Sequence, residues 1–260
     1  MSAGFGPELT ACAGLVARAD PARFRAAMAA PVAARARLFP IYAFNIEVAR
    51  APWVTQEPMI AEMRLQWWRD VLAEIAEARP VRRHEVATPL AGVLDAEAAR
   101  LLDALVAARR QDVARAPFAD EAALRAYLDA TSGNLLRVAA RVLGPAHEAA
   151  LSPAGLALGL ANWLRAVPAL AAAGRAPLPD GRPEAVRRLA EEGLVHLRAA
   201  RARRAEVSRA ARPALLPLWE AGAVLGRAAR DPAAVAAGRL EPAPITSRAL
   251  LAWRALSGRW

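Results

Sequence analysis

The sequence predicts an all-α protein, and three observations favour that fold class. Apolar residues make up 56% of the 260 residues, and Ala and Leu, both strong helix formers, dominate them. No run alternates apolar and polar residues over the length of a strand, and no Asn-Gly or Asp-Gly pair joins two such runs. Helix-start and helix-stop signals recur along the whole chain. A chain of this length can bury a sizeable core, and we predict a single domain over residues 1–260.

The first helix signal lies near the N-terminus. Asp20 followed by Pro21 is typical of an N-cap with proline at the first helical position, and it predicts a helix over residues 22–30. Pro31 and Pro40 are expected to separate the next short segments, because proline disrupts a helix interior.

A long helix is predicted over residues 59–78. Apolar residues recur there every four positions, and Leu65, Trp68 and Leu72 widen the stripe. The stripe itself consists of Met63, Trp67, Val71 and Ile75. A Pro-rich loop is expected over 175–183. Further helices are predicted over residues 95–115, 121–143, 152–167, 182–212, 214–230 and 246–259, which makes about eight helices in all.

The charge balance is strongly basic. The formal net charge is +10, and all 35 cationic residues are arginine because the sequence has no lysine. Such an excess favours anionic partners such as membrane headgroups, nucleic acid or diphosphates, and it does not choose among them. Cys12 is the only cysteine, which excludes an intrachain disulfide and a multi-cysteine metal site.

Two observations bear on localisation. No basic opening followed by an apolar run marks a signal peptide at the N-terminus. The most apolar stretch, residues 155–174, is interrupted by Asn162, Arg165 and Pro168, so we expect no membrane-spanning helix. We therefore expect a cytoplasmic protein, for which a peripheral position at the inner membrane stays open.

Four segments resemble the squalene/phytoene synthase family, in the order in which that family has them. They are LFPIYAF (38–44), EMRLQWWRDVLAEI (62–75), HEVATPL (84–90), and GLALGLANWLRAV (155–167) with GRAPLP (174–179). The resemblance implies an isoprenoid-synthase-like helical bundle around a central cavity. In active members of such a family, two Asp-x-x-x-Asp helices face each other, hold Mg²⁺ and stabilise a departing diphosphate. Residues four apart share one helix face, which explains the spacing.

The family's aspartates are replaced in this sequence. The matching positions carry Ala49, Arg50 and Trp53 in the first motif and Ala166 and Leu170 in the second. We therefore expect no catalytic residues, no metal and no cofactor, and we interpret the chain as a non-catalytic pseudoenzyme of the family. The alternative is a Mg²⁺-dependent prenyltransferase that condenses farnesyl or geranylgeranyl diphosphate.

Other acids are weak substitutes for the missing ones. Asp70 and Glu74 have the four-residue spacing and are weak metal candidates, but their interleaving with Arg69 favours an ion-paired helix face. Glu47 lies near the first lost motif, where a polar or Arg-paired role is favoured over metal binding.

The sequence is also similar to a degenerate branch of this family, mitochondrial complex I assembly factor six. The similarity rests on three segments: AFNIE (43–47), MRLQWW (63–68) and LLAWR (250–254). It implies subunits or assembly factors of respiratory complex I as partners, with an anionic membrane surface as a further one. Fold and ancestry do not by themselves fix function.

If the family pattern holds, polar and aromatic side chains should line the central cavity. The candidates are Tyr42, Asn45, Arg64, Trp67, Asn134, Asn162 and Arg165. Trp67 and Trp68 could contact a prenyl chain, although aromatic residues at helical spacing are more often core. Thr131 to Asn134 lacks the frame of a nucleophile elbow and favours a helix bend or small-residue packing.

The remaining constellations favour ordinary roles. His84, His147 and His196 are far apart and are expected to be structural or at the surface. Arginine runs such as residues 198–204 lack any accompanying nucleic-acid motif, so we expect no nucleic-acid partner.

The C-terminal helix is the best candidate for membrane contact. Leu250, Trp253, Leu256 and Trp260 are predicted to form its apolar seam beside arginines, and Trp253, Leu256 and Trp260 are the candidate membrane-contact residues. Docking of this helix onto the bundle is the competing interpretation.

Overall fold

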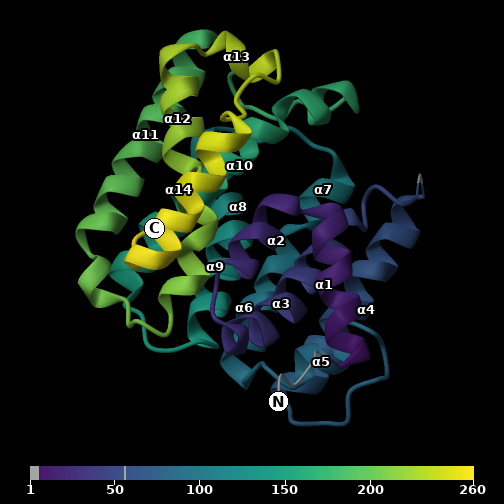
Figure 1. Ribbon diagram of the computed structural model, residues 1–260. Helices are drawn as coiled ribbons and strands as arrows, with labels where there is room; N and C mark the ends of the chain where they lie inside the picture. Colours follow the sequence, from purple (N-terminus) through teal and green to yellow (C-terminus); the bar gives the residue numbers. More distant parts are fainter. Residues whose placement is uncertain (1–5, 56) are drawn as a thin grey trace.

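Helix α10 (Glu148–Ala172) runs through the centre of the computed structural model, and helices on several sides pack against it (Figure 1). The structure describes residues 6–55 and 57–260. Within those ranges the chain is helical, and its only β-type pairing is an isolated bridge between Ala146 and Val207. The all-α prediction is therefore confirmed.

Seventeen helical segments follow one another in the described part of the chain. They are α1 (Pro7–Ala19), α2 (Pro21–Met28), α3 (Val32–Arg50), α4 (Pro58–Ala76), α5 (Ala87–Ala91), α6 (Ala96–Ala108), α7 (Arg110–Ala114), α8 (Glu121–Leu128), the π-helical η1 (Asp129–Gly133), α9 (Asn134–Arg141), α10, α11 (Pro183–Ala202), the 3₁₀ segments η2 (Arg204–Glu206) and η3 (Arg212–Trp219), α12 (Ala221–Arg230), α13 (Ala233–Ala236) and α14 (Pro244–Ser257).

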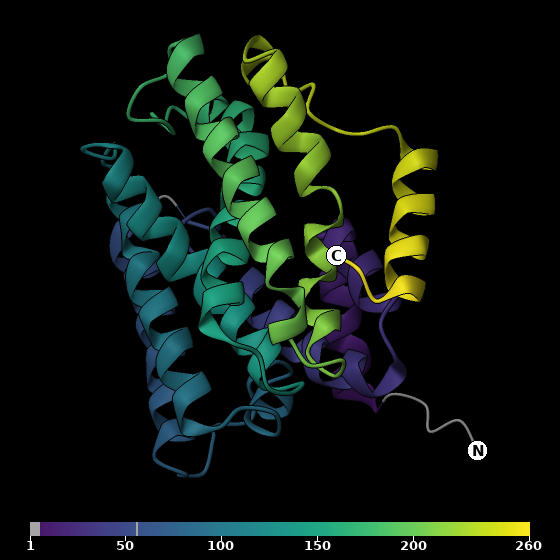
Figure 2. The ribbon, with the colours of Figure 1, turned by 90° about the vertical axis from the view of Figure 1, so that its left-hand side faces the viewer.

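The helices form two groups joined through η1 and α9, which contact both α6 and α10. The N-terminal group contains α1 to α6, and the C-terminal group contains α11 and α12, which run side by side in both views (Figures 1 and 2). Helix α14 stands apart from α11 and α12 in Figure 2 and packs chiefly against η3. Buried apolar side chains from nearly all of these elements form one hydrophobic cluster.

Two predicted helix breaks do not occur. Pro40 lies inside α3 and Pro168 lies inside α10, so each helix continues through its proline. Proline removes one backbone donor from a helix, but Pro40 is buried among the apolar residues of α3, and that packing offsets the lost hydrogen bond. Four predicted helices are instead divided: residues 95–115 into α6 and α7, residues 121–143 into α8, η1 and α9, residues 182–212 into α11 and η2, and residues 214–230 into η3 and α12.

Helix α10 is, within the part of the chain that the structure describes, the one helix long and apolar enough to cross a membrane. Half of the most apolar 18-residue stretch of this helix is buried inside the protein. Arg165 of the same helix forms ion pairs with Glu220 and Glu241. Its surroundings are those of a core helix packed by its neighbours.

Glycines allow α10 to approach η1 closely. A Cβ atom on Gly155 would lie 2.7 Å from the Cα atom of Gly133, which is closer than side chains pack. A Cβ atom on Gly159 would lie 3.1 Å from the Cβ atom of Ser132. The segment Thr131 to Asn134 thus combines a local change of helix type with small-residue packing, as the sequence suggested.

The single cysteine is part of this core. Cys12 in α1 is 0% exposed, and its thiol lies 3.6 Å from the backbone oxygen of Glu85. Burial raises the pKa of Cys12 to about 12, with smaller contributions from Glu85 and Glu8. The thiol is therefore protonated at neutral pH.

Candidate functional site

A cavity of about 290 Å³ lies between α3, α7, η1 and α10. Its lining combines residues that are distant in sequence: Asp20, Arg23, Asn45, Ala49, Trp53, Arg109, Asp112, Leu128, Thr131, Ser132, Leu135, Gly159, Asn162, Trp163, Ala166 and Leu170. The volume is at the lower end of the range for small-molecule sites, about 300–1,000 Å³.

Two stripes of residues, one from each side, form opposite walls of this cavity. Asn45, Ala49 and Trp53 follow one another at intervals of four along α3 and the turn after it, and all three line the cavity. Asn162, Ala166 and Leu170 do the same along α10. Residues four apart lie on one helix face, so the two stripes face a common space.

The polar end of the cavity contains an ion pair from α2. Arg23 Nη1 lies 2.5 Å from Asp20 Oδ2, and the same carboxylate accepts a hydrogen bond from the backbone N–H of Arg23. Asp20 is therefore both the N-cap of α2 and the partner of a cation. The guanidinium of Arg23 also lies 5.2 Å from the ring centroid of Tyr42.

A second, buried polar cluster joins α7 to α8. Tyr127 donates a hydrogen bond to the Asp112 carboxylate, with oxygen–oxygen distances of 2.9 and 3.0 Å. Arg109 Nη1 donates to the Tyr127 hydroxyl at 2.7 Å and to Asp112 at 3.1 Å. Burial opposes the charge of Arg109, yet Tyr127 and Asp112 raise the pKa of its guanidinium. Burial also raises the pKa of Tyr127.

The loop after α10 covers the Trp53 side of the cavity. The Arg175 guanidinium lies 4.1 Å from the ring centroid of Trp53, and Arg175 Nη1 lies 3.9 Å from Asp112 Oδ1. Trp163 fixes the loop by donating from Nε1 to the backbone oxygen of Pro177 at 2.8 Å. Burial lowers the pKa of Arg175, so this cation is only partly compensated.

Comparison with known proteins identifies the architecture that carries this cavity. The family model for squalene/phytoene synthase matches residues 16–181, which is more than half of the chain. The chain belongs to the squalene/phytoene synthase family. Among curated proteins, none matches at a significant level.

Two solved structures show the same fold. A crystal structure of a dehydrosqualene synthase in complex with ligand aligns with a TM-score of 0.80 at 14% identity, covering 96% of this chain and 95% of that one. A crystal structure of squalene synthase HpnC from Alicyclobacillus acidocaldarius aligns with a TM-score of 0.70 at 16% identity, covering 86% of this chain and 93% of that one. The isoprenoid-synthase-like helical bundle is thereby confirmed.

Four of the five positions at which the sequence resemblance places the family's aspartates line the cavity. Ala49 and Trp53 lie on one wall, and Ala166 and Leu170 lie on the other. The fifth, Arg50, is exposed and forms an ion pair with Glu47 at 3.2 Å. Apolar and aromatic side chains therefore take the positions where the resemblance places carboxylates.

The residues present do not fit a Mg²⁺ site. Mg²⁺ requires carboxylate or other oxygen ligands, and no group of three or more His, Cys, Asp or Glu that could hold a metal occurs among residues 6–55 and 57–260. The cavity's two carboxylates, Asp20 and Asp112, are both bonded to arginines. Buried donors without a partner, Arg109 Nε and Arg175 Nη2, lie beside them, and an excess of donors disfavours a cation.

The structure brings only two of the seven predicted cavity residues together. Asn45 and Asn162 line the central cavity on opposite walls. Tyr42 is buried beside Arg23, and Asn134 Oδ1 accepts from Arg137 at 3.1 Å in a separate surface pocket. Arg165 donates to Glu220 and Glu241 at 2.6 and 2.7 Å instead of reaching the cavity.

Arg64 and Trp67, also predicted for the central cavity, line a different and smaller one. That cavity measures about 170 Å³ and is completed by Glu47, Trp68 and His84. Trp67 and Trp68 meet edge to face with ring centroids 4.8 Å apart, which is the arrangement of packed core aromatics.

The weak metal candidates do not meet at a common site. Asp70 is exposed and accepts a hydrogen bond from Gln66 Nε2 at 2.8 Å. Glu74 is buried and pairs with Arg82, whose hydrogen bonds lower the pKa of the Glu74 carboxyl. Glu74 thus has an arginine partner, as the sequence favoured, but from a buried position, and the partner found for Asp70 is the amide of Gln66.

The C-terminal helix presents its residues differently from the predicted seam. Trp253 is 50% exposed and Leu256 is 89% exposed, whereas Trp260 is 1% exposed and packs in the core. Trp260 therefore does not fit the predicted membrane contact. Gly258 has φ +64° and ends α14 at Ser257, so the last residues leave the helix and Trp260 turns inward.

Sequence reasoning missed the charged residues of the cavity. Arg109 and Asp112 were assigned only to a helix, and Arg175 only to a loop motif. The contact of Arg175 with Asp112 joins segments far apart in the chain, and no spacing rule in one sequence connects such segments. Arg109 and Asp112 are three residues apart, a spacing that sequence reasoning could have used. Asp20 was recognised as an N-cap, and its ion pair with Arg23 three residues on was the signal available.

Proposed function

We propose that this chain is a non-catalytic member of the squalene/phytoene synthase family that acts as an assembly or scaffold factor for respiratory complex I at the inner face of the membrane. The observation that supports the non-catalytic part is the composition of the two cavity walls. Ala49, Trp53, Ala166 and Leu170 occupy aspartate positions and line the cavity. Metal stabilisation of a leaving group is worth several kcal/mol, and each ~1.4 kcal/mol is tenfold in rate.

Loss of both clusters should slow diphosphate ionisation by about a thousandfold or more. The direct test is product formation from farnesyl and geranylgeranyl diphosphate with Mg²⁺, with an active family member assayed in parallel. We expect no product at high protein concentration. Clear Mg²⁺-dependent turnover would establish the prenyltransferase alternative, and Asp20 and Asp112 would then be the first residues to substitute because they are the carboxylates in the cavity.

The cavity itself supports a retained binding role for a lipid or prenyl group. Its walls combine Trp53, Trp163 and Leu170 with the amides of Asn45 and Asn162, so an apolar chain with one polar end would match them. The test is equilibrium binding of farnesol and farnesyl diphosphate followed by tryptophan fluorescence. Leu135→Trp, which fills the cavity from the start of α9, should abolish any binding that uses it.

The assembly role is supported by the sequence similarity to complex I assembly factor six. Its test is affinity capture of the full chain from membranes of a host that makes complex I, followed by identification of the bound proteins. Recovery of complex I subunits or assembly factors is the expected result. Their absence, with the chain folded and at native abundance, would contradict this part of the proposal.

A further inference from the structure

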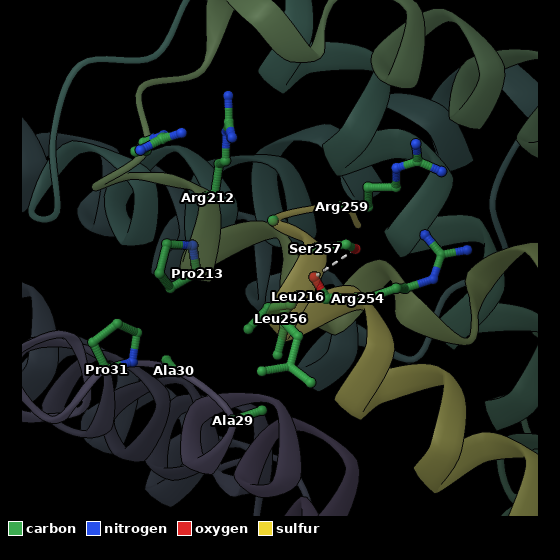
Figure 3. Close-up of a pocket in the computed structure, with 13 residues that line it drawn as sticks. Ala29, Ala30, Pro31, Arg212, Pro213, Leu216, Arg254, Leu256, Ser257 and Arg259 are labelled. Carbon is green, nitrogen blue, oxygen red and sulfur yellow. Dashed lines mark hydrogen bonds between the residues drawn. The ribbon is translucent and has the colours of Figure 1, made fainter.

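A crevice of about 380 Å³ lies between the end of α2, η3 and the end of α14 (Figure 3). Its apolar part comes from Ala29, Pro31 and Leu256, and Figure 3 shows Leu256 between α14 and Ala29. Arginine side chains extend around its rim, with Arg254 and Arg259 on one side and Arg212 on another. The crevice is separate from the central cavity, with which it shares no lining residue.

The crevice concentrates positive charge. Its lining contains Arg209, Arg212, Arg254 and Arg259, and no acidic residue is found among the described residues that line it. No ion pair in the described part of the chain involves any of these four arginines. The arginines of the central cavity, by contrast, have carboxylate partners: Arg23 with Asp20, and Arg109 with Asp112.

Two guanidinium groups of the crevice each have one uncompensated donor. The Nε atoms of Arg212 and Arg254 are buried and have no hydrogen-bond partner. Burial lowers the pKa of Arg254, and burial together with the charge of Arg254 lowers the pKa of Arg201 behind it to about 10. A lowered arginine pKa is the direction expected where buried positive charge lacks a compensating anion.

Large apolar side chains surround this charge on the outer surface. Leu256 is 89% exposed and Trp253 is 50% exposed on α14, and Val32 is 58% exposed at the start of α3. Leu256 is thus an exposed apolar side chain in a crevice that four arginines also line. This combination matches the boundary between lipid headgroups and acyl chains, where basic amphipathic helices lie.

We propose that this crevice binds the phosphate headgroup of an anionic phospholipid at a membrane surface. Arg212, Arg254 and Arg259 contact the phosphate oxygens, and Leu256 enters the acyl-chain boundary. Guanidinium groups match phosphate geometry well, which favours a phosphate over a carboxylate. The proposal deepens the membrane part of the proposed function and does not depend on the absence of catalysis, so vesicle binding and product formation can fail independently.

The experiment is flotation of the full chain with vesicles. One set contains phosphatidylcholine only, and the other contains equal parts of phosphatidylcholine and phosphatidylglycerol. We expect binding to the anionic vesicles and little binding to the neutral ones, with a decrease at high salt. Each arginine near the surface contributes about 1 kcal/mol, or about fivefold. Arg212→Gln/Arg254→Gln/Arg259→Gln should therefore weaken partitioning on the order of a hundredfold.

The matched control removes the same charge from other faces. Arg83, Arg198 and Arg230 are exposed and outside the ion pairs found in the described residues, so R83Q/R198Q/R230Q should bind within a few-fold of the wild type. Leu256→Ser changes an exposed side chain and leaves folding intact, and it should weaken binding by several-fold. Circular dichroism verifies the fold of each variant.

Three results would overturn the proposal. Equal binding to neutral and anionic vesicles would indicate a surface that does not recognise phosphate charge. Equal weakening by the crevice and control variants would indicate a response to net charge only. Displacement from vesicles by inorganic phosphate at millimolar concentration would identify a soluble phosphate as the occupant of the crevice.

Discussion

The guanidinium of Arg175 stacks over the indole of Trp53, 4.1 Å from the ring centroid. Trp53 stands at a position that the family resemblance assigns to an aspartate, and Arg175 belongs to the loop that follows α10. An aspartate at that position would pair with this arginine through charge, whereas the indole pairs with it through its π face. The contact joins both halves of the cavity rim without any metal.

We predict that Trp53 and Arg175 are energetically coupled. A double-mutant cycle with Trp53→Leu and Arg175→Met, measured by urea unfolding, should give a coupling of about 1–2 kcal/mol because the Arg175 side chain is largely desolvated. The control pair is Arg259 and Trp253, 5.2 Å apart on the surface, where about 0.5 kcal/mol is expected. Equal coupling in the two pairs would refute the role given to burial.

The Arg109–Asp112–Tyr127 cluster should respond unequally to loss of its members. Arg109→Met leaves the buried Asp112 carboxylate without its cation and should reduce the free energy of unfolding by about 3–5 kcal/mol. Tyr127→Phe removes hydrogen bonds only and should cost about 1–2 kcal/mol. Urea unfolding measures both, with Arg100→Met as a control at an exposed ion pair worth less than about 1 kcal/mol. A smaller loss for Arg109→Met than for Tyr127→Phe would contradict this account.

Gly155 should be the least replaceable small residue of α10. Gly155→Ala places a Cβ atom 2.7 Å from the Cα atom of Gly133, so α10 and η1 must separate, and we expect a loss of about 1–3 kcal/mol. Gly226→Ala in α12 meets only the flexible end of Arg230 at 3.4 Å, and it should be neutral or stabilising by up to about 1 kcal/mol. Thermal unfolding of the Gly155→Ala and Gly226→Ala variants measures both changes in stability. A stable Gly155→Ala variant would show that the helices can move apart freely.

The Glu74–Arg82 pair should make stability depend on pH in the acid range. The hydrogen bonds that Arg82 donates to Glu74 lower the pKa of the Glu74 carboxyl below its ordinary value of 4.5. A carboxyl with a lowered folded-state pKa contributes stability that is fully present above its unfolded-state pKa and is lost as the pH falls through the folded-state pKa. Glu74→Gln should thus cost about 2 kcal/mol at pH 7, with the difference from the wild type shrinking below pH 4.5.

Urea unfolding at several pH values measures this dependence. Glu77→Gln is the control, because Glu77 is 60% exposed in its ion pair with Arg79 and should show little pH-dependent difference. A Glu74→Gln deficit that persists undiminished at pH 3 would point to packing and not to charge as its cause.

The helices with clear local signals were predictable, and the exceptions have physical causes. Residues 59–78 were predicted as a helix, and α4 spans Pro58–Ala76. Helix α1 was missed although Pro7 at its start is a usable signal. The apolar Met63, expected in the core, is 66% exposed, because tertiary packing buries Leu65, Trp68 and Leu72 on the neighbouring face.

The walls of the cavity were predictable through the family pattern, but its charges were not. The four-residue spacing of Asn162, Ala166 and Leu170 follows from helix geometry once the motif is recognised. The contacts of Tyr127 with Arg109 and Asp112, and the stacking of Arg175 on Trp53, depend on how loops fold over the bundle. The burial of Trp260 was also not predictable from the sequence. The left-handed turn at Gly258 ends the helical periodicity on which the predicted apolar seam of the C-terminal helix depends.

The burial of Cys12 has a practical consequence for studying the protein in membranes. A thiol that is 0% exposed and protonated at neutral pH does not react with maleimides or methanethiosulfonates. The native chain therefore serves as an unreactive background, into which Leu256→Cys or Ile245→Cys introduces one labelling point at either end of α14. Spin labels at these two positions would report immersion depth and helix tilt in a bilayer, with no need to remove the natural cysteine first.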